Sequence, residues 1–205
     1  MRDQVSLPYV AFEGIEGAGK STVAERVGER LETDGHEVVR VREPGGTAVG
    51  ERIRAILLGH DLLPDPWTEA LLFAAARAQL AVEVVGPALD SGAWVLSDRS
   101  VYSSLAYQGA GRGLGIDAVR SVNEPGLQGV WPSLVILLGI DPAEGLLRQD
   151  VGDRIGDEGV EFQQTVADGF TTAAASEPDR FAIIDAGIPL DDVVDAAYRE
   201  IRSRW

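Results

Sequence analysis

The segment between residues 14 and 21 restricts the possible folds more than any other feature of this sequence. It reads Gly-Ile-Glu-Gly-Ala-Gly-Lys-Ser and matches the pattern G-x-x-x-x-G-K-[ST]. A strand-length apolar run, residues 9–13, precedes it, and Val23, Val27 and Leu31 follow at the spacing of one helix face. In such a strand–loop–helix unit, backbone N–H groups and the positive helix N-terminus surround phosphate oxygens. The sequence therefore predicts an α/β fold with a nucleoside triphosphate site at this loop.

Each residue type inside the loop would bind a different part of a triphosphate and its magnesium ion. Glycines allow close backbone approach, the lysine reaches the β- and γ-phosphates, and the serine hydroxyl is a ligand for Mg²⁺. Lys20 is the only lysine among 18 basic residues, which indicates that an arginine does not serve in its place. We expect the triphosphate to contact one continuous segment: Gly14, Ile15, Glu16, Gly17, Ala18, Gly19, Lys20, Ser21 and Thr22.

Strand-like and helix-like segments alternate along the rest of the chain, which is typical of a parallel sheet covered by helices. The strands are apolar throughout, as expected when both faces of a sheet are buried. The expected strands are 9–13, 37–41, 93–96, 134–138 and 181–184; the expected helices are one ending at Asp34-Gly35, 48–58, 67–89 with an interruption at Pro87, and 191–204. The glycine-rich segment 109–115 is expected to be a loop. We therefore predict a P-loop NTPase-type three-layer fold with a five-stranded, mostly parallel sheet and helices on both faces.

Composition excludes several other classes of protein. With 205 residues, 45% hydrophobic content and no cysteine, the chain is not expected to be disordered, a disulfide scaffold or a zinc finger. Its net charge of −15 disfavours nucleic acid as a partner. No apolar run approaches the roughly 18 residues of a membrane span, and the N-terminus does not resemble a signal peptide, so we expect a cytoplasmic protein without a membrane partner. Lysine scarcity with an acid excess resembles proteins of salt-loving organisms, although a GC-rich genome would also lower the lysine content.

The loop alone leaves three classes of nucleotide-binding protein open: switch GTPases, ATPase motors and small-molecule kinases. The guanine-reading motif N-K-x-D of GTPases needs a second lysine, which the chain lacks. Motors usually end a strand in paired acids, whereas the strand at 93–96 leads into Ser97-Asp98-Arg99. Asp98 could hold magnesium through water, and Arg99 could face a second phosphate, because ligands bind at the carboxyl ends of parallel strands. A simple ion pair at the strand end is the alternative, and we favour the site of a nucleotide kinase.

Several segments in the same order together resemble the thymidylate kinase family of the bacterial type. The resemblance extends from about residue 9 to about residue 190, and its most specific parts are Arg-Glu-Pro-Gly-Gly and Ala-Tyr-Gln-Gly. The matching segments are Phe12–Ser21, Arg42–Thr47, Leu72–Gln79, Ser97–Arg99, Ser104–Gly109 and Asp153–Ile155. The resemblance implies transfer of the γ-phosphoryl group from MgATP to dTMP, which gives dTDP and ADP for dTTP synthesis.

The resemblance also implies a site for dTMP. Phe73 would stack on the thymine ring, although a core phenylalanine is the alternative, and Arg77 would bind a thymine carbonyl. The bidentate forks of Arg54 and Arg99 would hold the dTMP phosphate. The remaining implied contacts are Tyr107 against the 2′ carbon of the sugar, Glu16 at the 3′ hydroxyl, Gln108 and Ser104 at the base, Ser21 and Asp98 at Mg²⁺, and a cis peptide before Pro44.

In this family a lid supplies a catalytic arginine when the phosphate loop lacks one, as here. The resemblance places a short lid at approximately 148–157 within one kinase domain, residues 1–205. We expect Arg148 and Arg154 to share catalysis with Lys20 and Arg99, and Asp153 to organise the magnesium or the lid. The resemblance further implies a homodimer. A kinase for another acceptor, such as dUMP, and a non-catalytic nucleotide-binding regulator stay open as alternatives.

Overall fold

A computed structural model describes residues 8–148 and 154–205. Its centre is a five-stranded sheet in the order β2-β3-β1-β4-β5, in which every pair of neighbouring strands is parallel. The strands are β1 (Tyr9–Glu13), β2 (Val38–Arg42), β3 (Trp94–Asp98), β4 (Leu134–Gly139) and β5 (Phe181–Asp185). This confirms the predicted α/β class and strand number; the strand ends differ from the expected ones by at most one residue, except that β3 ends at Asp98, two residues later than expected.

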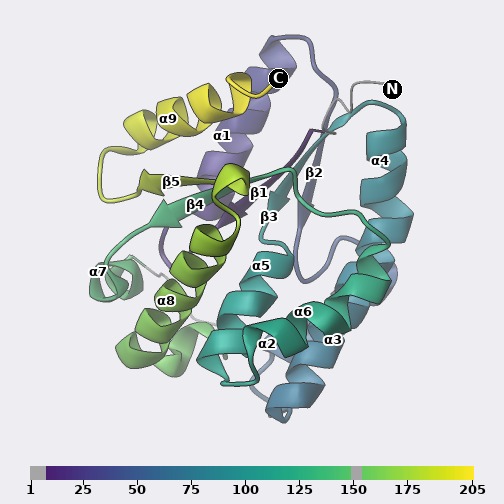
Figure 1. The fold of residues 1–205 in the computed structure, drawn as a ribbon, viewed down its shortest axis with the longest axis vertical. Helices are drawn as coiled ribbons and strands as arrows, with labels where there is room; N and C mark the ends of the chain where they lie inside the picture. Colours follow the sequence, from purple (N-terminus) through teal and green to yellow (C-terminus); the bar gives the residue numbers. More distant parts are fainter. Residues whose placement is uncertain (1–7, 149–153) are drawn as a thin grey trace.

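Helices cover both faces of the sheet because alternate residues of each buried strand point to opposite sides. Val10 and Phe12 pack beneath α1 (Lys20–Thr33) and α9 (Leu190–Arg202). Ala11 packs on the other face, beneath α5 (Val101–Ser104), α6 (Ile116–Leu127) and α8 (Val160–Ser176). Figure 1 shows α1 and α9 side by side on one face and α5, α6 and α8 together on the other. The remaining helical elements are α2 (Ala48–Leu58), α3 (Pro66–Leu80), η1 (Ala81–Val85), α4 (Gly86–Asp90), η2 (Leu105–Gly111), α7 (Pro142–Leu147), η3 (Gly156–Glu158) and η4 (Pro178–Arg180).

The expected interruption at Pro87 is wrong. Elements α3, η1 and α4 form one continuous helical segment, in which η1 is a π-helical turn. Pro87 lies in the first turn of α4, where its missing N–H is not needed, and the widened π turn before it accommodates the ring.

By length and composition alone, this segment, Pro66–Asp90, could cross a membrane, which the sequence analysis did not anticipate. One third of its most apolar window is buried in the fold. The segment also carries Glu69 and Arg77, which are both buried and hydrogen-bonded to other elements.

The expected loop at 109–115 is also partly wrong. Gly109 and Gly111 belong to η2, a π-helical segment that continues α5. Both glycines allow close packing: an added Cβ would lie 3.0 Å from the Cα of Ile116 at Gly109, and 2.8 Å from the Phe162 ring at Gly111. The glycines here therefore serve contact between helices, and only the residues after Gly111 form a turn.

Candidate active site

One cavity of about 470 Å³ lies at the carboxyl ends of the central strands. It is enclosed by the loop after β1, the segment after β2, helices α2 and α3, and the segment from the end of β3 through η2. Its lining residues are Glu16, Gly17, Gly19, Lys20, Ser21, Thr22, Arg42, Glu43, Pro44, Arg54, Leu58, Phe73, Asp98, Arg99, Ser103, Tyr107, Gln108 and Ile155. The topology thus brings most of the predicted triphosphate and acceptor residues to one space.

The loop after β1 has the form that anion binding requires. Gly17 has φ 73° and an added Cβ would lie 1.9 Å from the carbonyl oxygen of Gly145, so only glycine fits there. Lys20 is the first residue of α1, and its Nζ donates a hydrogen bond to the Ile15 carbonyl at 2.7 Å. Burial, reinforced by the charge of Arg99, lowers the pKa of Lys20 to about 8. The ammonium is therefore held at the N-terminus of α1, where it adds to the positive end of the helix dipole.

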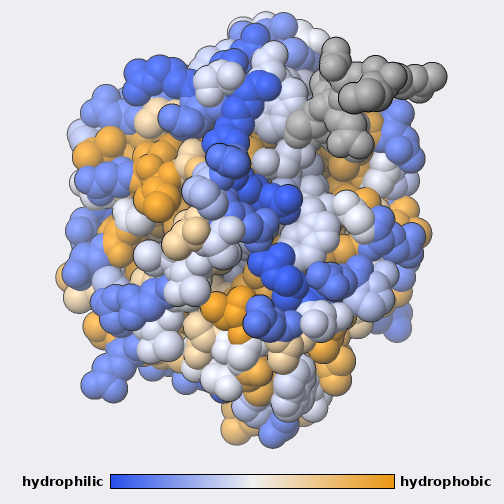
Figure 2. All heavy atoms as spheres, in the orientation of Figure 1, coloured by the Kyte–Doolittle hydropathy of each residue, from blue (hydrophilic) through white to orange (hydrophobic). Residues whose placement is uncertain are grey.

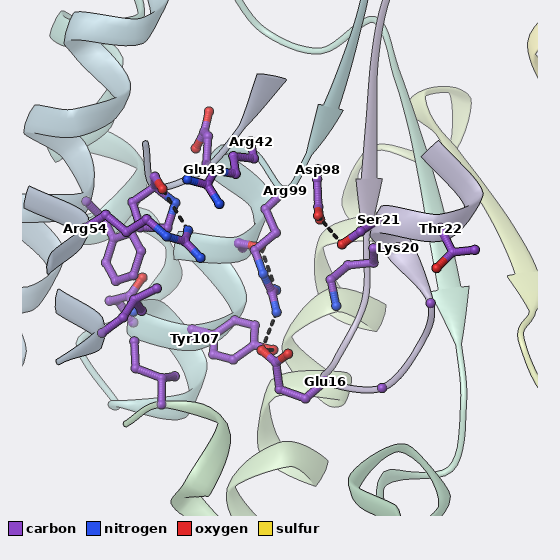
Figure 3. A pocket seen from close by; sticks show the side chains of 18 residues that line it. Glu16, Lys20, Ser21, Thr22, Arg42, Glu43, Arg54, Asp98, Arg99 and Tyr107 are labelled. Carbon is purple, nitrogen blue, oxygen red and sulfur yellow. Dashed lines mark hydrogen bonds and ion pairs between the residues drawn. The ribbon is translucent and has the colours of Figure 1, made fainter. Parts of the chain in front are cut away.

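Ser21 and Asp98 bring two oxygen groups together at the side of this loop. The Ser21 hydroxyl donates to Oδ2 of Asp98 at 2.5 Å, although the two residues are 77 positions apart (Figure 3). Hydroxyl and carboxylate oxygens are ligands of the kind that Mg²⁺ prefers, and Mg²⁺ usually takes its other ligands from water and phosphates. Among the described residues, no group of three or more His, Cys, Asp or Glu side chains could hold a metal. The pair therefore fits a magnesium ion that arrives with a nucleotide.

Arg99 and Glu16 form an ion pair in the middle of the cavity (Figure 3). Arg99 has φ 70°, which is uncommon for a residue other than glycine and turns its side chain back toward the loop. Tyr107 donates to Glu16 at 3.2 Å, and the Arg99 guanidinium lies over the Tyr107 ring, 5.0 Å from its centroid. Burial raises the pKa of Glu16, but the charges of Arg99 and Lys20 and the hydrogen bonds outweigh it and leave the pKa at about 2.

The opposite wall of the cavity carries the predicted acceptor residues. Arg54 Nη1 donates to the Pro44 carbonyl at 2.9 Å, and the Glu43–Pro44 peptide is cis, as the resemblance implied. Phe73 lines the cavity and also packs against the core on the α5–α8 face, and its stacking on a base stays a prediction. Gln108 lines the same wall and is buried.

Seven of the predicted site residues that the structure describes do not line the cavity: Gly14, Ile15 and Ala18 of the loop, and Arg77, Ser104, Arg148 and Arg154. Arg77 lies buried, where it donates to Glu43 Oε2 at 2.6 Å, to Asn123 and to the Ser100 carbonyl at 3.1 Å. Ser104 is also buried, and its hydroxyl has no hydrogen-bond partner among the described residues.

Arg148 donates to the Ala186 carbonyl at 2.9 Å and to Glu144 at 2.5 Å, whereas Arg154 donates to the Leu57 carbonyl at 3.0 Å and to Glu69 at 2.6 Å. The catalytic roles expected for these two arginines, and the base contact of Arg77, stay predictions. Asp153 and residues 149–152 lie outside the described residues.

Sequence reasoning missed Glu13, which is fully buried at the end of β1. Its carboxylate accepts hydrogen bonds from the N–H and hydroxyl groups of both Ser100 and Ser103, at 2.6 to 3.1 Å. The Ser103 hydroxyl also accepts from Arg99 Nη1 at 3.2 Å, so Glu13 fixes the backbone and one side-chain contact around Arg99. An acid that ends an otherwise apolar, buried strand was the available signal.

The fold and the cavity define a class: an α/β phosphotransferase that holds a triphosphate on a P-loop opposite a second anion site. Comparison with known proteins narrows this class. The sequence model of the thymidylate kinase family matches residues 12–197. The chain belongs to the thymidylate kinase family.

Curated relatives and a solved structure agree with this assignment. Thymidylate kinase from Bacillus pumilus is 44% identical over 200 residues, which cover 95% of this chain and 94% of that protein. Thymidylate kinase from Deinococcus radiodurans is 42% identical over 199 residues, which cover 96% and 97%. The crystal structure of thymidylate kinase from Ehrlichia chaffeensis superposes with a TM-score of 0.79 at 28% identity and covers 96% of this chain and 98% of that one.

Proposed function

We propose that this chain transfers the γ-phosphoryl group of ATP to dTMP and releases dTDP and ADP. The observation that carries the proposal is one cavity with Lys20 and the Ser21–Asp98 pair on one side, Arg54 on the other and Arg99 between them (Figure 3). Two phosphate-binding sets that face each other bring a donor and an acceptor phosphate together, and positioning with electrostatic stabilisation is most of phosphoryl-transfer catalysis. The family membership supports ATP and dTMP as the two substrates.

The donor side would bind the triphosphate through Gly14–Thr22. Lys20 would contact the β- and γ-phosphates, and the backbone N–H groups of the loop would hold the remaining oxygens. Ser21 and Asp98 would hold Mg²⁺ as part of MgATP, directly or through water. Bound there, the ion neutralises charge on the β- and γ-oxygens.

The acceptor side would bind dTMP between Arg54, Arg99 and Phe73. The two guanidiniums would hold the monophosphate, and the ring of Phe73 would stack on the base. Tyr107 would exclude a 2′ hydroxyl, and Glu16 would accept a hydrogen bond from the 3′ hydroxyl. Arg77, Ser104 and Gln108 complete the proposed set around the base.

A second cation at the transferring group would come from Arg148 or Arg154. Each now bonds to a carboxylate and a backbone carbonyl away from the cavity, so each would have to exchange these partners to reach a phosphate. Arg99 already lines the cavity near Lys20, but it also bonds to a carboxylate, that of Glu16, and would have to share or exchange this partner to bind a phosphate.

We further propose that the protein is a cytoplasmic homodimer that takes small-molecule substrates and neither nucleic acid nor a membrane as partner. Two apolar side chains of α3, Trp67 and Leu71, are exposed, which supports contact between this helix and a second copy of the chain. The net charge of −15 supports the absence of a nucleic-acid partner.

The substitution Lys20→Ala tests the phosphate-transfer role. We expect dTDP formation, followed by ³¹P NMR, to fall by at least about 10²-fold, because one preorganised donor at a developing charge contributes about this much. The thermal melt should stay cooperative. Arg26→Ala on the same helix, which removes only an exposed ion pair with Asp191, should retain activity. Normal turnover by a folded Lys20→Ala variant would contradict the assignment of the loop.

A further inference from the structure

Glu69, in the first turn of α3, is 1% exposed and lies behind the base side of the cavity. Three residues donate to its carboxylate. Gln108 Nε2 and Arg112 Nε bond to Oε1 at 2.9 and 3.1 Å, and Arg154 Nη2 and Arg112 Nη2 bond to Oε2 at 2.6 and 3.3 Å. None of the roles proposed above for the reaction uses this buried acid.

The neighbours of Glu69 keep it ionised. Burial raises its pKa, but the hydrogen bonds from Arg112, Arg154 and Gln108 outweigh burial, and the net shift is downward. An ionised carboxylate only accepts hydrogen bonds. The Gln108 amide must therefore turn its NH₂ group toward Glu69.

This orientation leaves the amide oxygen of Gln108 for the cavity. Gln108 is 1% exposed, but it lines the cavity together with Phe73 and Tyr107. Among the described residues, no group donates a hydrogen bond to its amide oxygen. The cavity thus presents an acceptor, and not a donor, at this point of the base wall.

We propose that Glu69 is a positioning residue for base choice: it fixes the Gln108 amide so that an oxygen faces the acceptor base, which favours pyrimidines with an N3–H over cytosine. This inference rests on the proposed function. Thymine and uracil carry a donor at N3, whereas cytosine carries an unprotonated nitrogen that would face the Gln108 oxygen lone pairs. A mispaired polar group of this kind lowers the specificity constant more than the loss of an apolar contact does.

Glu69→Gln should reverse the orientation. Arg154 Nη2 and Arg112 Nη2 only donate, so they would keep an oxygen at the Oε2 position, and the NH₂ group would take the Oε1 position opposite Gln108 and Arg112 Nε. Gln108 would then turn its oxygen to residue 69 and its NH₂ to the cavity. The substitution is isosteric, and its other direct effect is that Arg112 Nε loses its acceptor.

The experiment measures kcat and KM for dTMP, dUMP and dCMP with the wild type, Glu69→Gln and Glu158→Gln. Glu158 pairs with Arg112 at 2.6 Å on the side away from Gln108, so its variant removes a carboxylate from the same cluster without touching the amide. We expect Glu69→Gln to lower the dTMP-to-dCMP ratio of kcat/KM by about tenfold or more, mainly through KM, with dUMP following dTMP. Glu158→Gln should keep the wild-type ratio.

An unchanged ratio in a folded Glu69→Gln variant would overturn the proposal and leave Glu69 a purely structural residue. If that variant does not fold, the same measurement is made with Gln108→Leu. A lower dTMP-to-dCMP ratio of kcat/KM supports the acceptor role of Gln108, and an unchanged ratio overturns it. Wild-type protein that phosphorylates none of the three nucleotides would contradict the proposed function instead. In that case the ratio of dTMP to dCMP binding constants, measured by calorimetry on the same variants, tests Glu69 separately.

Discussion

Glu16 places a carboxylate inside a loop whose backbone N–H groups suit anions. Burying this charged group is unfavourable, but Arg99, Lys20 and Tyr107 offset the penalty. Together they hold the pKa of Glu16 at about 2, below the ordinary value of about 4.3 for a glutamate. A lowered pKa in the folded state means that the ionised pair stabilises the protein above pH ~4.3. This contribution is lost progressively as the pH falls toward 2.

Glu16→Gln should therefore destabilise the protein at pH 6 by about 1–3 kcal/mol, because Arg99 loses its charged partner. The difference between variant and wild type should shrink when urea unfolding is repeated at pH 3. As a control, Asp191→Asn removes an exposed ion pair with Arg26 and should change stability by less than about 1 kcal/mol. A deficit of Glu16→Gln that is equal at both pH values would show that the charge of Glu16 contributes nothing.

At the scale of elements, the close contact between α8 and η2 positions Tyr107 and Gln108. Gly169 on α8 faces η2 so closely that an added Cβ would lie 2.8 Å from Ala110 Cβ and 3.1 Å from Ala106 Cα. Glycine at this position is explained by packing, since alanine would otherwise be favoured in a helix by about 1 kcal/mol.

Gly169→Ala is expected to reduce the free energy of unfolding in spite of its better helix propensity. Overpacking costs about 1–3 kcal/mol, so a net loss of about 1 kcal/mol or more should appear in urea unfolding. The KM for dTMP should rise as well, because η2 carries the base side of the site. Asp168→Ala, an exposed change on the same helix, should be near neutral; a Gly169→Ala protein as stable as the wild type would show that the two elements are loosely packed.

The elements differ in how far they could be predicted. The bounds of β1 and α2 follow from local patterns, because an apolar run and a Thr47 cap act over a few residues. The π-helical segments η1 and η2 were missed because proline and glycine are ordinarily signals for breaks and loops, and here neighbouring elements decide.

The residues of the candidate site also differ in how far they could be predicted from the sequence. The phosphate loop and Asp98-Arg99 were found because their spacing carries the chemistry. Glu13 and Glu69 were missed because the roles of buried acids depend on partners 39 to 90 positions away. Arg148 and Arg154 were expected at the phosphates. Glu144 lies four residues before Arg148, so that pair could have been predicted from helix spacing, whereas local sequence could not show that Glu69 binds Arg154.

At the scale of the whole molecule, hydrophilic side chains cover most of the face in Figure 2, with apolar ones scattered among them. Among the described residues, the buried acids are Glu13, Glu43 and Glu69, so the acid excess is carried mostly at the surface, where like charges keep copies of the chain apart. Helix α3 departs from this pattern: Trp67 and Leu71, one turn apart on the same face, are 41% and 53% exposed. An apolar helix face on so acidic a protein suits contact with a second copy.

Leu71→Glu should therefore dissociate the proposed homodimer. Light scattering should give about twice 21.8 kDa for the wild type and 21.8 kDa for this variant. Ile183→Glu, at an exposed position of the edge strand β5 and away from α3, should leave the mass unchanged. A wild type of 21.8 kDa at every concentration, or a Leu71→Glu variant that stays dimeric, would exclude this helix as the interface.

If the cavity holds MgATP and dTMP for direct transfer, ADP release should depend on the acceptor nucleotide. We would measure coupled ADP release with MgATP and with dTMP, dUMP, the ribonucleotide of thymine, CMP or AMP as acceptor, at low salt and in molar potassium chloride. We expect strong preference for dTMP, and activity confined to high salt would further indicate a halophilic protein. Absence of turnover with every acceptor in both salts, from folded protein that still binds ATP, would exclude the proposed transfer and favour a regulatory nucleotide-binding protein.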